Sequence, residues 1–188
     1  MSIMEEKTVK SQVIHKGNIT EYVLEEVRLP NGKIAPREIV RHDDAAAIIP
    51  FTDDGKVLFV KQYRKPIEQA LFEIPAGLMD ETDASPLETA KRELEEETGC
   101  RAKQWEMITS FYSSPGFTDE FLTIYEAKGL YQVEEPLQQD EDENLELKAL
   151  SFEEAWAEYE QGTIRDAKTV FGLFHWKAKR DCGEAIDE

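Results

Sequence analysis

This sequence has few of the residues that build several common kinds of site. Its 188 residues include only two cysteines and three histidines. That is too few for a disulfide framework, and no Cys/His spacing is typical of zinc or of a catalytic thiol pair. No hydrophobic run approaches the length of a membrane span, and the N-terminal residues MSIMEEKTVK lack the apolar core of a signal peptide. We therefore expect reduced cysteines, no membrane association and a cytoplasmic location.

Basic residues are also scarce relative to acidic ones. The chain carries 22 Lys and Arg against 40 Asp and Glu, a formal net charge of -18. This charge repels nucleic acid, and no basic stripe compensates for it, so we expect no polynucleotide partner. A small anionic substrate would be repelled as well, unless bound divalent cations and a few placed arginines reverse the field locally.

The most distinctive stretch spans residues 77–99 and reads GLMDETDASPLETAKRELEEETG. Ser85, followed by Pro86 and Glu88, has the form of a capping box with proline at the first helical position. Gly99 suits the left-handed residue just beyond a helix end. The sequence therefore predicts a helix between Ser85 and Gly99.

One face of this helix gathers carboxylates, because residues three and four apart share a face: Glu93, Glu96 and Glu97. An adjacent apolar stripe, which we expect to pack, consists of Leu87, Ala90 and Leu94. Like charges this close repel, and Arg92 supplies only one counter-charge. Oxygen ligands without His or Cys favour Mg²⁺ or Mn²⁺ over zinc. A solvated surface face is the alternative interpretation of the same pattern.

The fuller pattern resembles a known signature. Gly77, Asp83, Arg92-Glu93-Leu94, Glu96-Glu97 and Gly99 together resemble the Nudix box of the Nudix hydrolases. The family has Glu at the position of Asp83, followed by seven residues before the arginine, where this chain has eight. A one-residue insertion in the loop before Ser85 is the simplest account, and it leaves the register of the helix intact.

The resemblance implies the α/β/α sandwich of Nudix proteins with a mixed sheet, preceded here by a small antiparallel sheet. We divide the chain into an N-terminal β-sheet element, residues 1–43, and a Nudix hydrolase domain, residues 44–188. Alternating apolar residues in 19–29 and 34–41 flank the turn signal Pro30-Asn31-Gly32-Lys33. Such a hairpin is marginally stable alone, so it must pack on the main domain or on another subunit.

The remaining elements follow from the same patterns. Residues 45–50 and 56–62 are short apolar runs around Asp53-Asp54-Gly55, consistent with a buried hairpin. Further strands are expected at 70–75, 104–112, 121–127 and 145–150. Helices are expected from Ser151, which opens a capping box, and over 166–179.

Two arginines and one glutamate have both structural and functional interpretations. Arg37, on the returning N-terminal strand, is either a surface charge or a contact to a substrate base or phosphate. Arg64 follows a core strand, where its guanidinium is either exposed or placed to bind a phosphate bidentately. Glu73 either faces the site or forms a structural pair.

A second resemblance narrows the family to one branch. Ser114-Pro115-Gly116 is by itself only a turn, but its position after the box is similar to a marker of the ADP-ribose pyrophosphatases. Arg-Glu-Ile at 37–39, Tyr-Arg at 63–64 and Phe-Glu-Ile-Pro-Ala-Gly at 72–77 also resemble that branch. The resemblance implies hydrolysis of ADP-ribose to AMP and ribose 5-phosphate, with Arg37, Arg64, Pro115 and Gly116 in substrate binding.

The resemblance also implies the roles of the acidic residues. Glu93, Glu96, Glu97 and the carbonyl of Ala76 would hold Mg²⁺, with Mn²⁺ as an alternative ion. In the acidic loop 138–144, Glu141 would be the general base and Glu143 a further metal ligand, with Glu143 the second candidate for the base. The branch commonly forms homodimers through its N-terminal sheet, so we expect a homodimer.

Two other functions remain open from the sequence. The same box serves hydrolases of other nucleoside diphosphate sugars, such as GDP-mannose. A catalytically silent sensor that binds ADP-ribose is the alternative from a different class, although several close carboxylates are not needed for binding alone.

Overall fold

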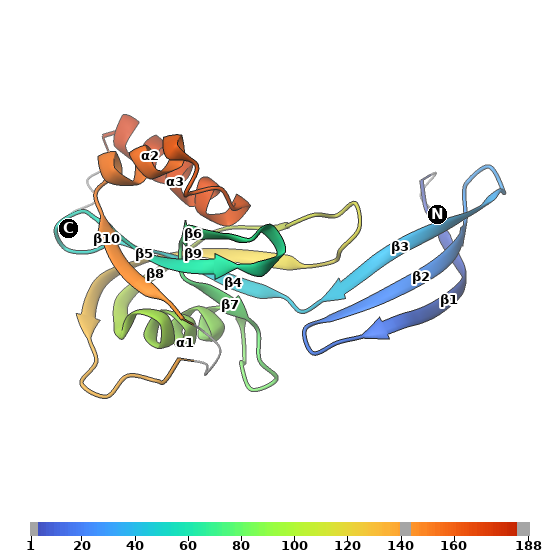
Figure 1. Cartoon of the computed structure of the whole chain (residues 1–188), viewed down its shortest axis with the longest axis horizontal. Coiled ribbons are helices and arrows are strands. Elements are labelled where there is room, and N and C mark those ends of the chain that lie inside the picture. The colour runs from blue at the N-terminus through green and yellow to red at the C-terminus, as the bar shows by residue number, and fades with distance from the viewer. Residues whose placement is uncertain (1–3, 140–143, 184–188) are drawn as a thin grey trace. The chain divides into compact units, whose positions relative to one another are not determined.

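The computed structural model describes residues 4–139 and 144–183 of the chain (Figure 1). Glu141 and Glu143 lie outside the described residues. The chain divides into two compact units, Met1–Asp44 with Phe111–Leu122, and Ala45–Ser110 with Thr123–Glu188. The first unit thus includes a segment from the middle of the chain in addition to the N-terminal element.

The N-terminal unit is built on a three-stranded antiparallel sheet in the order β1-β2-β3. Its strands are β1 (Lys7–Lys16), β2 (Thr20–Arg28) and β3 (Ile34–His42). The predicted turn between the last two strands is confirmed, with Gly32 at φ +84°. Every residue of β1 is exposed, whereas Val23 and Val27 of β2 are buried. The segment 113–120 joins this sheet where the Val40 N–H donates to the Phe117 carbonyl at 2.8 Å.

The described residues of the second unit form two sheets and three helices. Their orders are β7-β4-β9-β8 and β10-β5-β6. The strands are β4 (Ala45–Pro50), β5 (Val57–Arg64), β6 (Gln69–Glu73), β7 (Ala76–Leu78), β8 (Cys100–Tyr112), β9 (Phe121–Gln132) and β10 (Glu146–Leu150), of which β8 and β9 extend into the first unit. The helices are α1 (Pro86–Thr98), α2 (Phe152–Gln161) and α3 (Ala167–Asp181), with a 3₁₀ turn at Lys65–Ile67. Within this unit, α1 lies on one side of the strands, and α2 and α3 lie on the other (Figure 1), which confirms the predicted sandwich.

Residues 45–50 and 56–62 were predicted to form a buried hairpin. The turn between them is present, but the predicted pairing of the two strands is wrong. Phe51 and Val57 form an isolated antiparallel bridge, closed by a 2.9 Å bond from the Thr52 N–H to the Lys56 carbonyl. After this bridge β4 and β5 separate into different sheets. Apolar runs buried on both faces identify strands, but they do not determine which strand pairs with which.

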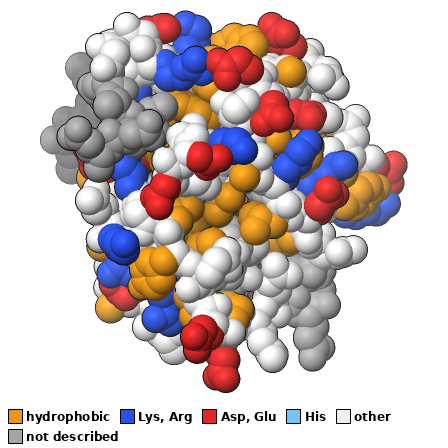
Figure 2. Space-filling view, turned by 90° about the vertical axis from the view of Figure 1, so that its left-hand side faces the viewer, with side chains coloured by type: hydrophobic (Ala, Val, Ile, Leu, Met, Phe, Trp, Pro, Cys, Tyr) orange, Lys and Arg blue, Asp and Glu red, His pale blue; other side chains and the backbone are white. Residues whose placement is uncertain are grey.

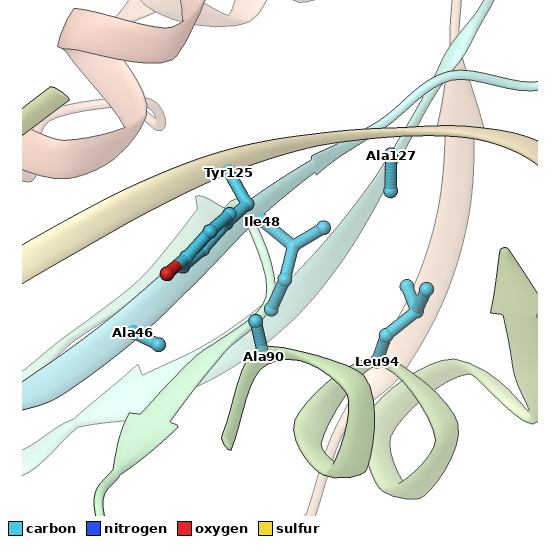
Figure 3. Close-up of a cluster of buried hydrophobic side chains, with 6 residues drawn as sticks. All are labelled: Ala46, Ile48, Ala90, Leu94, Tyr125 and Ala127. Carbon is cyan, nitrogen blue, oxygen red and sulfur yellow. The ribbon is translucent and has the colours of Figure 1, made fainter. Parts of the chain in front are cut away.

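Helix α1 begins and ends where the sequence predicts. The Ser85 hydroxyl accepts the Glu88 N–H at 3.4 Å, and Gly99 closes the helix at φ +68°. The Glu88 side chain accepts a bond from Lys91 at 2.8 Å. Ala90 and Leu94 are fully buried and point from the helix toward the strands (Figure 3). Their partners in this cluster are Ala46 and Ile48 of β4 and Tyr125 and Ala127 of β9.

One face of the molecule shows how charged and hydrophobic side chains are distributed on it. On the face shown in Figure 2, Lys and Arg side chains are interspersed with Asp and Glu, and hydrophobic side chains are exposed between them. No helix within residues 4–139 and 144–183 is long and apolar enough to cross a membrane.

A buried carboxylate joins α3 to β9. Glu126 is only 2% exposed, and its two oxygens accept hydrogen bonds from Lys179 at 2.8 and 2.9 Å. His175 Nε2 lies 3.2 Å from the same carboxylate, and Lys128 Nζ lies 3.4 Å away. Burial opposes ionisation of Glu126, but these bonds and charges outweigh it and lower its pKa from 4.5 to about 2.

This cluster gives the protein an acid-sensitive stability. Because the folded pKa lies below the unfolded one, the contribution of Glu126 is complete above about pH 4.5 and is lost as the pH falls toward 2. We expect Glu126→Gln to lower the free energy of unfolding by about 3 kcal/mol at pH 7. Urea unfolding at pH 7, 5, 4 and 3 should show the two proteins converging by at most about 1.4 kcal/mol per pH unit below pH 4.5. A difference that does not change with pH would contradict this account.

Candidate active site

The predicted carboxylates of α1 lie on one part of the helix, and two of them are buried. Glu93 and Glu97 are 8% and 4% exposed, whereas Glu96 is half-buried. The Arg92 guanidinium compensates two of these charges, with Nη1 donating to Glu93 at 2.6 Å and to Glu96 at 2.8 Å. The predicted solvated-surface alternative does not describe Glu93 and Glu97, because burial of a charge is costly unless it serves a specific interaction.

Asp83 ties the loop before α1 to the same arginine. Its carboxylate accepts from Arg92 Nη2 at 2.9 Å and from the Thr89 hydroxyl at 3.0 Å. Arg92 Nη2 also donates to the Leu78 carbonyl at 2.9 Å. The bond from Arg92 is the main reason that the pKa of Asp83 falls to about 2. The loop before α1 is therefore anchored to the helix through Asp83, a role that the local sequence pattern did not reveal.

Ala76 and Gly77, on strand β7, lie against the two buried glutamates of α1. The Ala76 N–H donates to Glu97 Oε2 at 3.2 Å. At Gly77, an added Cβ would lie 2.0 Å from Glu93 Oε1 and 2.1 Å from its Cδ. Glycine leaves room for this carboxylate in its present position, and any larger residue would require the Glu93 side chain to shift.

These residues fit a hard divalent cation by the chemistry of their donors. Glu93, Glu96, Glu97 and the Ala76 carbonyl offer oxygen only, the ligand type that Mg²⁺ and Mn²⁺ prefer. In the part of the chain that the structure describes, no three His, Cys, Asp or Glu side chains gather at metal-ligand spacing. The carboxylates are instead held by Arg92 and by the Ala76 amide.

Arg64 lies near the same helix. Its Nε and Nη2 donate to the two oxygens of Glu73, both at 2.7 Å. This bond is the main reason that the pKa of Arg64 is raised, and the charge of Glu97 adds to the shift. The negative charge of Glu97 therefore stabilises the positive charge of Arg64, and Glu73 has Arg64 as a charged partner.

The other predicted substrate contacts belong to the N-terminal unit. Arg37 donates from Nε to Glu6 at 2.8 Å, and the pair raises the pKa of Arg37. Pro115 and Gly116 are exposed in the turn that the Phe117 N–H closes on the Ser114 carbonyl at 3.1 Å.

The same unit contains an arginine that the sequence analysis missed. Arg41 donates to Asp119 at 2.8 Å and thereby joins β3 to the segment 113–120. No local pattern links two residues so far apart in the sequence.

Comparisons with known proteins agree with this geometry. Residues 41–172 match the profile of the NUDIX domain. The chain is 43% identical over 179 residues to an ADP-ribose pyrophosphatase of Bacillus subtilis (strain 168), covering 95% of this chain and 96% of the relative. It is 44% identical over 171 residues to a methanol dehydrogenase activator of Bacillus methanolicus, covering 91% and 92%.

A solved structure shows the same fold. The structure titled "Crystal structure of ADP compounds hydrolase" superposes with a TM-score of 0.85 at 22% identity, covering 98% of this chain and 100% of the other. With the box on α1 and a matching domain over more than half of its length, the chain belongs to the Nudix hydrolase family.

Proposed function

We propose that this protein is a Mg²⁺-dependent hydrolase that cleaves the pyrophosphate bond of ADP-ribose to give AMP and ribose 5-phosphate. The observation that carries the proposal is the burial of Glu93 and Glu97 on α1, with the Glu93 carboxylate in the space that a Cβ at Gly77 would occupy. The 43% identity to an ADP-ribose pyrophosphatase supports the choice of substrate.

The chemistry follows from the donors on α1. Mg²⁺, held by Glu93, Glu96, Glu97 and the Ala76 carbonyl, would neutralise the pyrophosphate and lower the pKa of a water. In the hydrolysis the oxygen of a water would form a bond to one phosphorus while the bond from this phosphorus to the bridging oxygen breaks, which gives the two monophosphates. Arg64 binds a phosphate oxygen and holds the substrate in line. No protein nucleophile is needed, because such a displacement depends on positioning and charge neutralisation.

Glu141 takes the proton of the attacking water in this proposal. We expect Glu141→Gln to lower kcat for ADP-ribose by about 10²-fold or more, with KM changed less than threefold, because the loss of a general base impairs turnover more than binding. Steady-state release of AMP measures both constants. Glu143→Gln is the matched variant two residues away, and an unchanged kcat in Glu141→Gln would transfer the base role to Glu143.

A substrate panel tests the proposal as a whole. ADP-ribose, GDP-mannose and other nucleoside diphosphate sugars are incubated with Mg²⁺, and the nucleoside monophosphate is separated by chromatography. We expect the highest kcat/KM for ADP-ribose and no product in EDTA. Faster hydrolysis of GDP-mannose would show that GDP-mannose, not ADP-ribose, is the preferred substrate. Tight binding of ADP-ribose in Mg²⁺ with no AMP formed would establish the sensor alternative.

A second candidate function rests on the relative from Bacillus methanolicus. Its name describes activation of methanol dehydrogenase, and it matches this chain over 91% of its length. The test is to add this protein to a methanol dehydrogenase and measure alcohol oxidation. Stimulation by the wild type but not by Glu97→Gln would show that activation requires the hydrolytic site.

The proposal includes a homodimer that forms through the N-terminal sheet. All of β1 is exposed, including Val9, Val13 and Ile14 at 49–51%, and an exposed edge strand with apolar side chains favours pairing. Arg37 on β3 would then reach the site of the partner subunit. Sedimentation equilibrium should give twice the 21.6 kDa chain mass. We place the enzyme in the cytoplasm, where both free cysteines stay reduced.

A further inference from the structure

Arg64 belongs to a group of four charged side chains, and the other three, Glu73, Lys168 and Asp166, have no role in the hydrolysis proposed above. Glu73, at the end of β6, is 2% exposed. Besides the bidentate bond to Arg64, its carboxylate accepts a bond from Lys168 on α3. Lys168 also donates to Asp166, the N-cap of α3, at 2.9 Å. Two cations and two anions are thus concentrated between β5, β6 and the start of α3.

The bidentate bond determines which edge of Arg64 is available. Nε and Nη2 are both directed at Glu73, at 2.7 Å. Nη1 forms no hydrogen bond among the residues that the structure describes, and the Arg64 side chain is 42% exposed. A guanidinium held by one edge loses the rotamer freedom of a long side chain, and it can present its remaining donors in one fixed direction.

Burial makes this arrangement costly for a purely structural pair. A buried carboxylate recovers its desolvation cost only when its ion pair has excellent geometry. Two apolar residues in place of such an ion pair often stabilise a protein equally well. Here one partner of the buried carboxylate remains exposed, and Glu97 of α1 accepts the Ala76 N–H three residues after Glu73. That combination is expected where the exposed partner must be held ready for an anionic ligand.

We propose that Glu73 is a positioning residue, which holds Arg64 by its Nε–Nη2 edge so that Nη1 binds a phosphate oxygen of the nucleoside diphosphate substrate. This inference deepens the proposed function and rests on it for the identity of the ligand. Lys168 balances the charge of the cluster in this account, but it does not orient Arg64.

The experiment measures binding, so that it does not depend on turnover. The dissociation constant of ADP-ribose is determined by calorimetry in EDTA for the wild type, Arg64→Ala, Glu73→Gln and the double variant. We expect binding to weaken about tenfold in Arg64→Ala and by about threefold or more in Glu73→Gln. The double variant should bind no more than twofold more weakly than Arg64→Ala, because both changes remove one interaction.

Lys168→Gln is the matched control, since it removes another cation from the same carboxylate but leaves the Arg64–Glu73 pair in place. Its thermal stability should fall as in Glu73→Gln, while its dissociation constant stays within twofold of the wild type. Equal weakening in Lys168→Gln and Glu73→Gln, additive effects in the double variant, or a wild type that does not bind ADP-ribose would each overturn the inference.

Hydrolysis is measured separately as AMP release with Mg²⁺. If the binding pattern holds but no AMP forms, the proposed function fails and the positioning role stands. If AMP forms normally and Glu73→Gln binds like the wild type, the positioning role fails and the proposed function stands.

Discussion

Glu97→Gln is expected to lower kcat for ADP-ribose by about 10³-fold or more, and Glu93→Gln by a similar factor. Both side chains are buried on α1 and carry the charge proposed to hold Mg²⁺. Glutamine keeps their size, and at residue 97 its carbonyl oxygen can still accept the Ala76 N–H that Glu97 accepts at 3.2 Å. The loss should therefore appear in catalysis with the fold intact, as measured by AMP release and by far-UV circular dichroism.

The control for these variants lies on the same helix. Glu88 is exposed in the first turn of α1 and accepts a hydrogen bond from Lys91 at 2.8 Å. Glu88→Gln removes one negative charge from α1 without touching the proposed ligands, so its kcat should change less than twofold. A loss below tenfold in either Glu93→Gln or Glu97→Gln would contradict the metal assignment.

Gly77→Ala is expected to inactivate the enzyme nearly as strongly, although it adds only one methyl group. The new Cβ would lie 2.0 Å from Glu93 Oε1, much closer than two atoms can approach. The end of the Glu93 side chain is flexible and should move away before the backbone does. We expect kcat to fall about 10²-fold or more, since a displaced ligand loses its role in positioning, with a smaller effect on the melting temperature.

Two comparisons isolate this cause. Gly17→Ala should be silent, because the nearest atom to its added Cβ is the Thr20 carbonyl oxygen at 3.4 Å, an ordinary contact. The double variant Gly77→Ala/Glu93→Gln should lose little more activity than Glu93→Gln alone. Full additivity of the two losses, or retention of more than half of the activity in Gly77→Ala, would show that the close approach is not needed for catalysis.

The charged network around Arg92 illustrates what sequence reasoning can and cannot find. The spacing of Arg92 and Glu96 is local, so their pairing follows from helical geometry and is confirmed at 2.8 Å. The bond from Arg92 to Asp83 depends on how the preceding loop folds back on the helix, and no local pattern predicts that fold. The contact between Glu73 and Lys168 could not be predicted either, because the two residues are 95 positions apart in the sequence.

The sequence by itself determined the elements whose signals are local. Ser85 and Gly99 mark the ends of α1 by satisfying its terminal backbone groups, and the three- and four-residue spacing of Glu93, Glu96 and Glu97 places them on one part of the helix. Only the tertiary structure decided that β4 and β5 join different sheets, that Glu93 packs against Gly77, and that Arg64 is held by Glu73. The physical reason is that strand pairing and the burial of a charge depend on the groups that surround them in space, and those groups come from distant parts of the chain.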